Sequence, residues 1–174
     1  MRIFYDTEFL EDGRTIELIS IGMVADDGRE LYAVNRDAPW DRIREHDWLL
    51  TNVVPHLPRV RGDGSQLINF TDPLVKPRAA IAAEVLAFIR ATPNPDLWAW
   101  YCAYDHVALC QLFGRMVDLP PEVPMWTNDL QQVIVRAQSP DLPDQQSGVH
   151  DALADARHAQ RIAAFLERQT GRSL

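Results

Sequence analysis

The 174-residue chain is 47% hydrophobic and 24% charged, with a formal net charge of -8. This length and composition suit one globular unit with its own core, so we expect residues 1–174 to form a single domain. The excess of acids disfavours non-specific binding to duplex nucleic acid, which requires a basic surface. It leaves a nuclease open, because bound metal ions offset part of the charge of an acidic site.

The sequence also disfavours a membrane protein and a protein stabilised by disulfides or zinc. No apolar stretch approaches the roughly 20 residues that span a bilayer, and the first residues lack a signal-peptide pattern, so we expect a cytoplasmic protein. The two cysteines, Cys102 and Cys110, do not form a CxxC pair and lie in apolar surroundings. Free buried thiols are therefore the better interpretation.

The N-terminal part of the sequence predicts a three-stranded antiparallel meander. Strand-like patterns cover residues 3–7, 17–24 and 30–34. Turn signals separate these strands, with Gly13 in the first connection and Gly28 in the second. Strands joined by such short turns lie side by side in one sheet.

The rest of the sequence alternates between helical and strand patterns. One or two short helices are expected between residues 41 and 54, and a loop rich in Arg, Gly and Ser at 59–70. The later expected elements are a helix from Pro77 to just before Thr92, a strand at 97–102, a helix at about 107–113, a short strand at 124–127, a helix at 128–137 and a helix at about 152–169. A meander followed by this alternation predicts a mixed α/β fold with helices on both faces.

Two acids, Asp6 and Glu8, lie at the end of the first expected strand. Because one residue separates them, their side chains point to the same face of the sheet. Two acids on one face of a buried strand repel each other and lose hydration unless a positive group lies between them. A divalent cation would meet that need, whereas two ordinary acids at a solvated strand end are the alternative.

Three more candidate residues follow later in the chain. Asp105 comes just after the apolar stretch 97–102, His150 comes just before the last helix, and Asp155 lies in the alanine-rich first turns of that helix. Asp151 suits the N-cap position of the last helix, which leaves the acid one turn further on to be explained. Asp105 as a helix cap and His150 as an ordinary loop histidine are the alternatives.

Three segments together resemble a known family. They are Asp6-Thr-Glu8, Tyr101-Cys-Ala-Tyr-Asp105 and His150-Asp-Ala-Leu-Ala-Asp155. In this order they are similar to the three motifs of the DEDDh 3′-5′ exonucleases, which include RNase T, oligoribonuclease and the proofreading subunit of DNA polymerase III. The resemblance runs from residue 3 to about residue 165, and it is greatest to small bacterial polyadenylate-specific 3′-5′ exoribonucleases with a similar Phe-Tyr-Asp-Thr-Glu-Phe opening. It implies an RNase H-like sheet with three antiparallel strands followed by parallel strands.

The sequence departs from the family pattern at two positions. Tyr101 stands where many relatives carry asparagine, and Phe9 stands where relatives often carry threonine. Neither change removes a carboxylate. Both affect how the 3′-terminal nucleotide would be held.

The chemistry of phosphodiester hydrolysis suits these residues. It needs a hydroxide near neutral pH and stabilisation of the attacking and leaving oxygens, which two Mg²⁺ or Mn²⁺ ions held by carboxylates supply. The resemblance implies that Asp6 bridges both ions, that Glu8 and Asp155 complete the site that activates water, and that Asp105 supports the second ion. His150 is the expected general base, because an imidazole can accept the proton of the attacking water.

The expected substrate-binding residues are Thr7, Phe9 and Leu18. Phe9 directly follows the acid pair and could stack on a base, with a core phenylalanine as the alternative. Leu18 could wedge against a base, although a buried strand leucine is the stronger interpretation. Trp98 and Trp100 share one face of the expected strand and are assigned to the core.

The resemblance therefore predicts a metal-dependent 3′-5′ exoribonuclease that releases nucleoside 5′-monophosphates from single-stranded RNA or an RNA 3′ overhang. The alternatives are a DNA 3′-5′ exonuclease or proofreading module and a non-catalytic nucleotide-binding protein of the same fold. RNase T-like relatives also imply a homodimer. In it, Arg42, Arg44, Arg59 and Arg61 could serve the active site of the partner, with a solvated charge cluster as the alternative.

Overall fold

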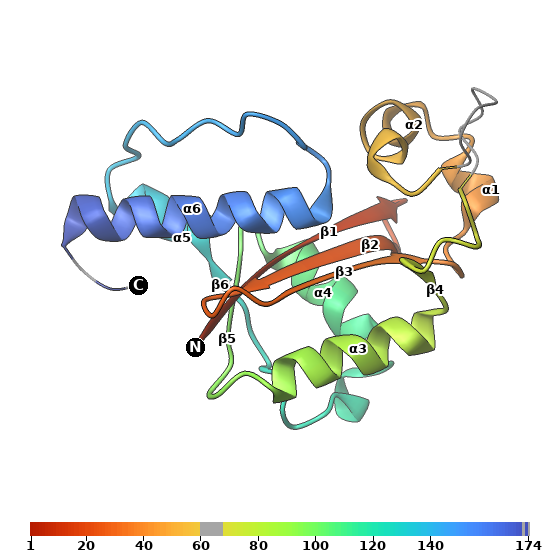
Figure 1. Ribbon diagram of the computed structural model, residues 1–174, viewed down its shortest axis with the longest axis horizontal. Coiled ribbons are helices and arrows are strands. Elements are labelled where there is room, and N and C mark those ends of the chain that lie inside the picture. The colour runs from red at the N-terminus through yellow and green to blue at the C-terminus, as the bar shows by residue number, and fades with distance from the viewer. Residues whose placement is uncertain (60–67, 172, 174) are drawn as a thin grey trace.

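A mixed β-sheet forms the centre of the computed structural model, which describes residues 1–59, 68–171 and 173. In this part of the chain the sheet has six strands in the order β4-β3-β2-β1-β5-β6 (Figure 1). The antiparallel strands are β1 (Arg2–Glu11), β2 (Ile16–Ala25) and β3 (Glu30–Asn35), whereas β4 (Val75–Lys76), β5 (Asp96–Ala99) and β6 (Asn128–Asp129) pair in parallel. The predicted RNase H-like arrangement is confirmed.

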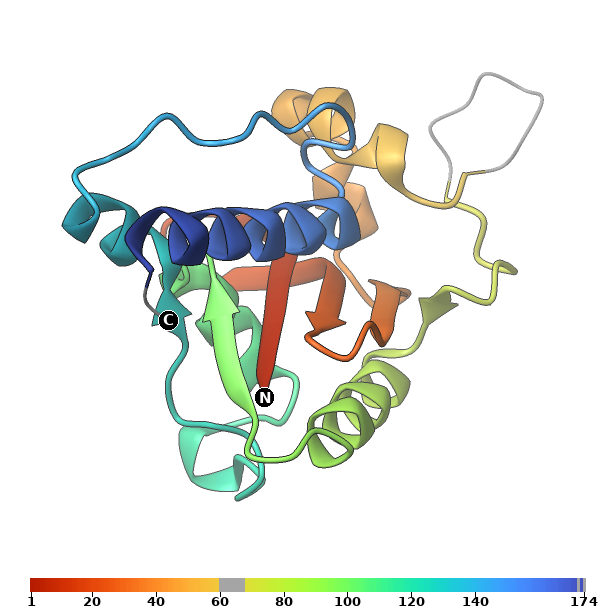
Figure 2. The same ribbon diagram turned by 60° about the vertical axis from the view of Figure 1, so that its left-hand side comes forward.

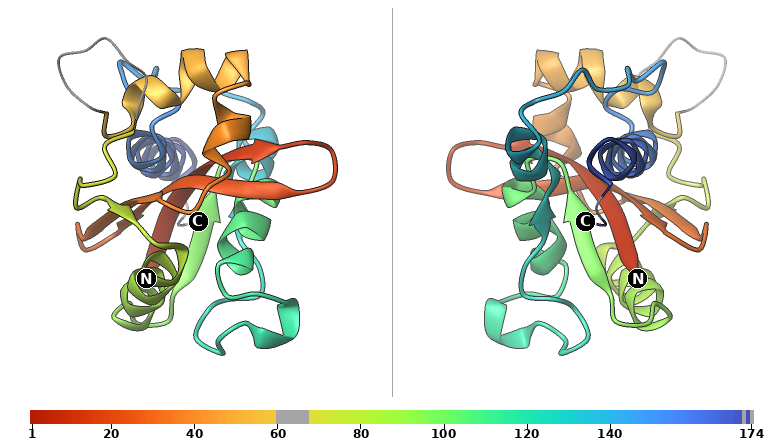
Figure 3. Two further views of the ribbon diagram at one scale, coloured as in Figure 1. Left: turned by 90° about the vertical axis from the view of Figure 1, so that its right-hand side faces the viewer. Right: turned by 90° about the vertical axis from the view of Figure 1, so that its left-hand side faces the viewer.

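Helices cover both faces of this sheet, as predicted. One layer contains α3 (Arg78–Arg90) and α4 (Ala103–Gln111). The other contains α1 (Trp40–Ile43), α2 (Asp47–Asn52), α5 (Leu130–Arg136) and α6 (Ala152–Thr170). The views along the sheet in Figure 3 show the two layers on opposite sides of the strands. Short 3-10 turns lie at η1 (Val54–His56) and η2 (Met116–Asp118). Among the described residues, no helix combines the length and the apolar character needed to cross a membrane.

The side chains of β1 alternate between the two layers. Ile3 and Tyr5 are fully buried in the hydrophobic cluster with α3 and α4, whereas Phe4 is fully buried in the cluster with α5 and α6. Asp6 and Glu8 continue the series of Phe4, because side chains two residues apart share a face of a strand. Both acids therefore face the layer that contains α6.

A β-bulge in β2 interrupts the alternation of that strand. Glu8 pairs with Ser20 but Phe9 pairs with Leu18, so Ile19 is an extra residue in β2. As a result, Ile19 packs with the α1 and α2 layer, and Leu18 packs with α3 and α4 on the opposite face. Leu18 is 1% exposed. The structure thus places Leu18 in the core, which agrees with the interpretation as a buried strand leucine.

The strand predicted at 97–102 ends early, at Ala99. Tyr101 adopts a left-handed backbone conformation, with φ of 59°, which a continuing strand does not allow. The next helix therefore begins at Ala103 and contains Asp105 in its first turn. The alternative in which Asp105 caps this helix is wrong, because Cys102 occupies the N-cap position.

The strand predicted at 124–127 is displaced to β6, at Asn128–Asp129. The helix predicted from residue 128 begins at Leu130 because Asp129 caps it, accepting a hydrogen bond from the Gln131 N–H. Most of the loop predicted at 59–70 lies outside the described residues, and Arg59 and Ile68 form an isolated bridge at its two sides.

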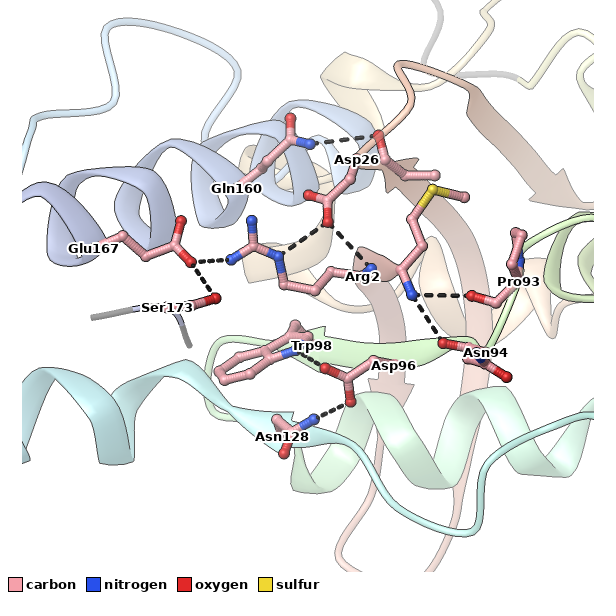
Figure 4. A network of polar contacts seen from close by, with 12 residues as sticks. Arg2, Asp26, Pro93, Asn94, Asp96, Trp98, Asn128, Gln160, Glu167 and Ser173 are labelled. Carbon is pink, nitrogen blue, oxygen red and sulfur yellow. Dashed lines mark hydrogen bonds and ion pairs between the residues drawn. The ribbon is translucent and has the colours of Figure 1, made fainter. Parts of the chain in front are cut away.

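Polar contacts of Arg2 fix α6 along the sheet (Figure 4). Its Nε atom donates to Asp26, next to the turn between β2 and β3, over 3.0 Å, and its Nη1 atom donates to Glu167 near the end of α6 over 2.9 Å. The start of α6 consequently lies over the opposite end of β1, where the acids are. The segment before α6 arches over that helix from the end of α5 (Figures 1 and 2).

Candidate active site

One cavity of about 610 Å³ contains all five predicted catalytic residues in its lining. Asp6 and Glu8 come from β1, Asp105 from α4, and His150 and Asp155 from the loop before α6 and its first turns. These segments are far apart in the sequence. The fold brings them together because α4 and α6 both begin beside the C-terminal half of β1.

Asp105 binds the edge of β1 beyond the point where β5 stops pairing with it. The last pair between β1 and β5 joins Phe4 to Trp98, so β1 has no strand neighbour on that side further on. There the backbone N–H and the hydroxyl of Thr7 both donate to Asp105 Oδ1, over 2.9 and 2.6 Å. Thr7 is 4% exposed. Its hydroxyl thus supports the Asp105 carboxylate. Thr7 also lines the cavity, and its contact with substrate stays a prediction.

The start of α6 orients Asp155. Asp151 is the N-cap, as predicted, and accepts hydrogen bonds from the N–H groups of Leu153 and Ala154. Asp155 accepts one hydrogen bond from the N–H of His150 over 2.9 Å and another from Gln145 Nε2 over 2.5 Å. Both carboxylate oxygens are therefore held by the segment that precedes the helix.

Gly22 allows α6 to begin this close to β1. It lies opposite Asp6 in the ladder between β1 and β2. A Cβ atom at Gly22 would lie 2.3 Å from the backbone nitrogen of Leu153. Only glycine accommodates this approach, so the main chain of β2 supports the helix start directly.

The electrostatics of the cavity are unusual because no described lysine or arginine pairs with its acids. Neither Asp6 nor Glu8 receives a hydrogen bond or an ion pair from any described residue, and no described Lys or Arg lines the cavity. Burial, with the neighbouring charges of Asp155 and Asp105, raises the pKa of Glu8 to about 8. Burial also raises the pKa of Asp105 to about 6, although the Thr7 hydrogen bonds oppose this.

Asp6 and Asp155 follow the same trend. Burial and the nearby Asp105 and Glu8 carboxylates raise the pKa of Asp6 well above its usual value, and burial raises that of Asp155. A divalent cation would relieve the repulsion and favour the ionised carboxylates. Glu8, His150 and Asp155 offer ligand atoms that all lie within 4.8 Å of one another. The donor set thus fits a hard divalent cation, for which carboxylate oxygens are preferred ligands.

Aromatic side chains form much of the remaining wall. Phe9 is half-buried and its ring stacks on Tyr104, with centroids 5.8 Å apart. Trp48, from α2, contacts the His150 ring edge to face, with centroids 4.8 Å apart. Tyr101 is 63% exposed and stacks on Trp100. Phe9 therefore lies in the cavity wall rather than in the core.

Sequence reasoning missed several of these wall residues. Trp100 packs against the core, as predicted, but it also lines the cavity, which could not be foreseen because β5 ends early. His158 lies one turn beyond Asp155 on α6, a spacing that could have identified it. Trp48 and Gln145 gave no such signal, since each reaches the cavity from a segment whose position depends on the tertiary fold.

Comparison with known proteins places this geometry in context. No family model matches the chain. Two curated proteins of Mycobacterium tuberculosis are similar to it in sequence. They are the 3′-5′ exoribonuclease Rv2179c of strain ATCC 25618 / H37Rv and the 3′-5′ exoribonuclease MT2234.1 of strain CDC 1551 / Oshkosh. Each is 49% identical over 159 residues, which cover 90% of this chain and 88% of the relative. The chain therefore belongs to the same family as these two mycobacterial 3′-5′ exoribonucleases.

Proposed function

We propose that this chain is a DEDDh-type 3′-5′ exoribonuclease that depends on a divalent metal. It would release nucleoside 5′-monophosphates from the 3′ end of single-stranded RNA or of an RNA overhang. The observation that carries the proposal is the pair of β1 carboxylates, Glu8 buried and Asp6 partly buried, which have no cationic partner among the described residues. They share one cavity with Asp105, His150 and Asp155. The names of the two relatives support RNA as the substrate.

The four carboxylates would hold two Mg²⁺ or Mn²⁺ ions. Glu8 and Asp155 would bind one ion, Asp105 would support the other, and Asp6 would contact both. When bound, the ions supply a hydroxide nucleophile near neutral pH and stabilise the charge that develops on the phosphate oxygens. The hydrogen bonds to Asp105 and Asp155 keep these carboxylates oriented before the ions arrive.

His150 would act as the general base. Its backbone N–H is held by Asp155, and its ring contacts Trp48 in the cavity wall. The imidazole can therefore accept the proton of the attacking water without moving the helix start. Phe9, stacked on Tyr104, would offer an aromatic surface to an unpaired base, which needs few basic residues.

The homodimer stays a proposal that rests on the family resemblance. The single domain and the cytoplasmic location, inferred from composition and sequence pattern, also stay proposals. Of the four arginines that could serve the active site of a partner, two form ion pairs within the chain. Arg42 pairs with Asp12 over 2.7 Å, and Arg44 pairs with Asp41 over 2.7 Å. Arg59 is exposed, and Arg61 lies outside the described residues.

A single assay tests the proposed activity. Purified protein is incubated with Mg²⁺ or Mn²⁺ and matched single-stranded RNA and DNA labelled at the 5′ end. A stepwise ladder on RNA supports the proposal, whereas a ladder on DNA alone favours a proofreading exonuclease. No ladder on either strand would leave a non-catalytic nucleotide-binding protein. The Asp155→Asn variant, purified in the same way, controls for contaminating nucleases.

A further inference from the structure

Two buried hydroxyl groups lie beside Glu8 without hydrogen bonds. Ser20 pairs with Glu8 across the ladder between β1 and β2 and is 0% exposed. Tyr32 lies on the next strand, β3, opposite Gly22. Among the described residues, the Ser20 Oγ atom and the Tyr32 hydroxyl are both buried and neither makes a hydrogen bond of normal geometry.

These hydroxyls lie on the same face of the sheet as the acids. Asp6, Gly22 and Tyr32 form one row of paired residues across the strands, and Glu8 and Ser20 begin the next row. Burial raises the pKa of Tyr32, the charges of Asp151, Glu8 and Asp72 raise it further, and a hydrogen-bonding contact with the Ser20 hydroxyl opposes the rise. Tyr32, Ser20 and Glu8 are therefore close neighbours, although the two hydroxyls miss a regular hydrogen bond.

An unsatisfied buried hydroxyl is disfavoured, and two adjacent ones need a reason. Alanine and phenylalanine would fill the same positions without burying an unpaired polar atom. Glu8 supplies the complementary group, because its carboxylate also lacks a donor among the described residues. Two hydroxyls that lack a hydrogen bond of normal geometry thus lie beside a carboxylate that lacks a donor.

We propose that Ser20 and Tyr32 are positioning residues that hold the ionised Glu8 carboxylate when a divalent cation is bound. In this relay the Tyr32 hydroxyl donates to Ser20 Oγ, and the Ser20 hydroxyl donates to one Glu8 carboxylate oxygen. Each hydroxyl donates one hydrogen bond, so the Tyr32 hydroxyl, the Ser20 hydroxyl and one Glu8 oxygen each have a partner. The relay rests on the proposed function, because it assigns the cation to Glu8.

The relay approaches Glu8 from behind the cation site. Ser20 and Tyr32 are not among the described residues that line the cavity, whereas Glu8 is. Donation from β2 would therefore leave the cavity side of the carboxylate to the cation. Asp151, another acid near Tyr32, accepts two backbone hydrogen bonds at its Oδ1 atom as the N-cap of α6. We assign Ser20 as the acceptor for the Tyr32 hydroxyl because Ser20 pairs with Glu8 across the ladder.

The relay predicts how strongly each variant binds Mn²⁺ in the absence of RNA. The Ser20→Ala variant should bind Mn²⁺ about tenfold more weakly than wild type, the lower end of the effect of removing a partner that orients a metal ligand. The Tyr32→Phe variant should bind a few-fold more weakly. The double variant should match Ser20→Ala, because Tyr32 acts only through Ser20. Isothermal titration calorimetry measures all four affinities.

The thermal stability of the metal-free proteins gives an independent readout. Removing an unpaired buried hydroxyl should leave the melting temperature of Ser20→Ala unchanged or raise it. A matched control is Thr92→Val, since the Thr92 hydroxyl is buried but donates to the Phe88 carbonyl over 2.9 Å. This control should lower the melting temperature and leave Mn²⁺ affinity unchanged.

The outcomes separate the relay from the proposed function. If wild type and Asp155→Asn bind Mn²⁺ equally, the metal site is wrong and the relay falls with it. If wild type binds through Asp155 but Ser20→Ala keeps the wild-type affinity, the relay alone is overturned. A loss of affinity together with a lower metal-free melting temperature would also overturn it, since that pattern indicates damage to the fold.

Discussion

The acids of this protein fall into two groups that differ in their partners. On the surface, Glu30 pairs with Arg157 and Glu122 pairs with Arg90, and hydrogen bonds from these arginines lower the pKa of both acids. In the cavity, Glu8 has no cationic partner among the described residues, and burial raises its pKa to about 8. The pKa of glutamate is thus lowered on the surface and raised in the cavity of the same chain.

This difference shows that the described residues compensate the negative charge of these surface acids but not that of Glu8 in the cavity. Ion pairs satisfy many surface acids, where they contribute little to stability. The cavity acids are buried or partly buried, where unpaired charges cost more than on the surface, and yet no described arginine or lysine lines the cavity. Strongly perturbed carboxylates in a cavity mark functional sites. Their compensating charge is therefore expected from a ligand rather than from the protein.

The largest effect is expected when one charge is removed from the cavity by the Asp6→Asn variant. Turnover should fall by about three orders of magnitude, because the proposed site loses the ligand shared by both ions. The melting temperature in EDTA should rise, since one source of repulsion is gone. Turnover assays and thermal unfolding test both effects. Full activity, or a lower melting temperature, would contradict the role given to this carboxylate.

A change that leaves the four acids in place separates chemistry from metal binding. The His150→Ala variant should lose about 10²- to 10⁴-fold in turnover, the usual contribution of a general base. Its Mn²⁺ affinity should stay near that of wild type. Calorimetry and single-turnover kinetics make the comparison. A parallel loss of affinity would instead make His150 a metal ligand, which its distance to Glu8 and Asp155 permits.

The raised pKa of Glu8 predicts how the stability of the metal-free protein depends on pH. Between about 4.5, the usual value, and about 8 the folded protein keeps a proton on Glu8 that the unfolded chain has lost. Stability should therefore fall as pH rises through this window, since each pKa unit corresponds to about 1.4 kcal/mol. Denaturation in EDTA at several pH values should show a shallower fall for Glu8→Gln. An identical slope would refute the assignment.

The smallest effect is expected in the surface group. Glu122→Gln removes an ion pair with Arg90 that is open to solvent. Such pairs contribute little and are screened by salt. Turnover and Mn²⁺ affinity should match wild type, and the melting temperature should scarcely change. A clear loss of activity would show that the two groups of acids are not independent.

The part of the site that could be predicted depends on local geometry. Alternation along a strand places Asp6 and Glu8 on one face whatever the rest of the fold does. Helical spacing places Asp155 one turn beyond the cap residue Asp151. The order of strand and helix patterns was likewise enough for the mixed sheet and its covering layers, although the two-residue strand β4 was not predicted.

The remaining parts depend on backbone details that no local pattern records. The extra residue Ile19 moves Leu18 to the opposite face of the sheet. The left-handed conformation of Tyr101 ends β5 early and turns Trp100 into a wall residue. Gln145 reaches Asp155 from a long loop, whose path is set by tertiary contacts.

The contact between Gly22 and the start of α6 bears on how this centre can be altered. Because main chain rests on main chain there, the spacing between the β1 acids and Asp155 is independent of which side chains fill the core. Redesign of the proposed metal ligands should accordingly leave Gly22 untouched.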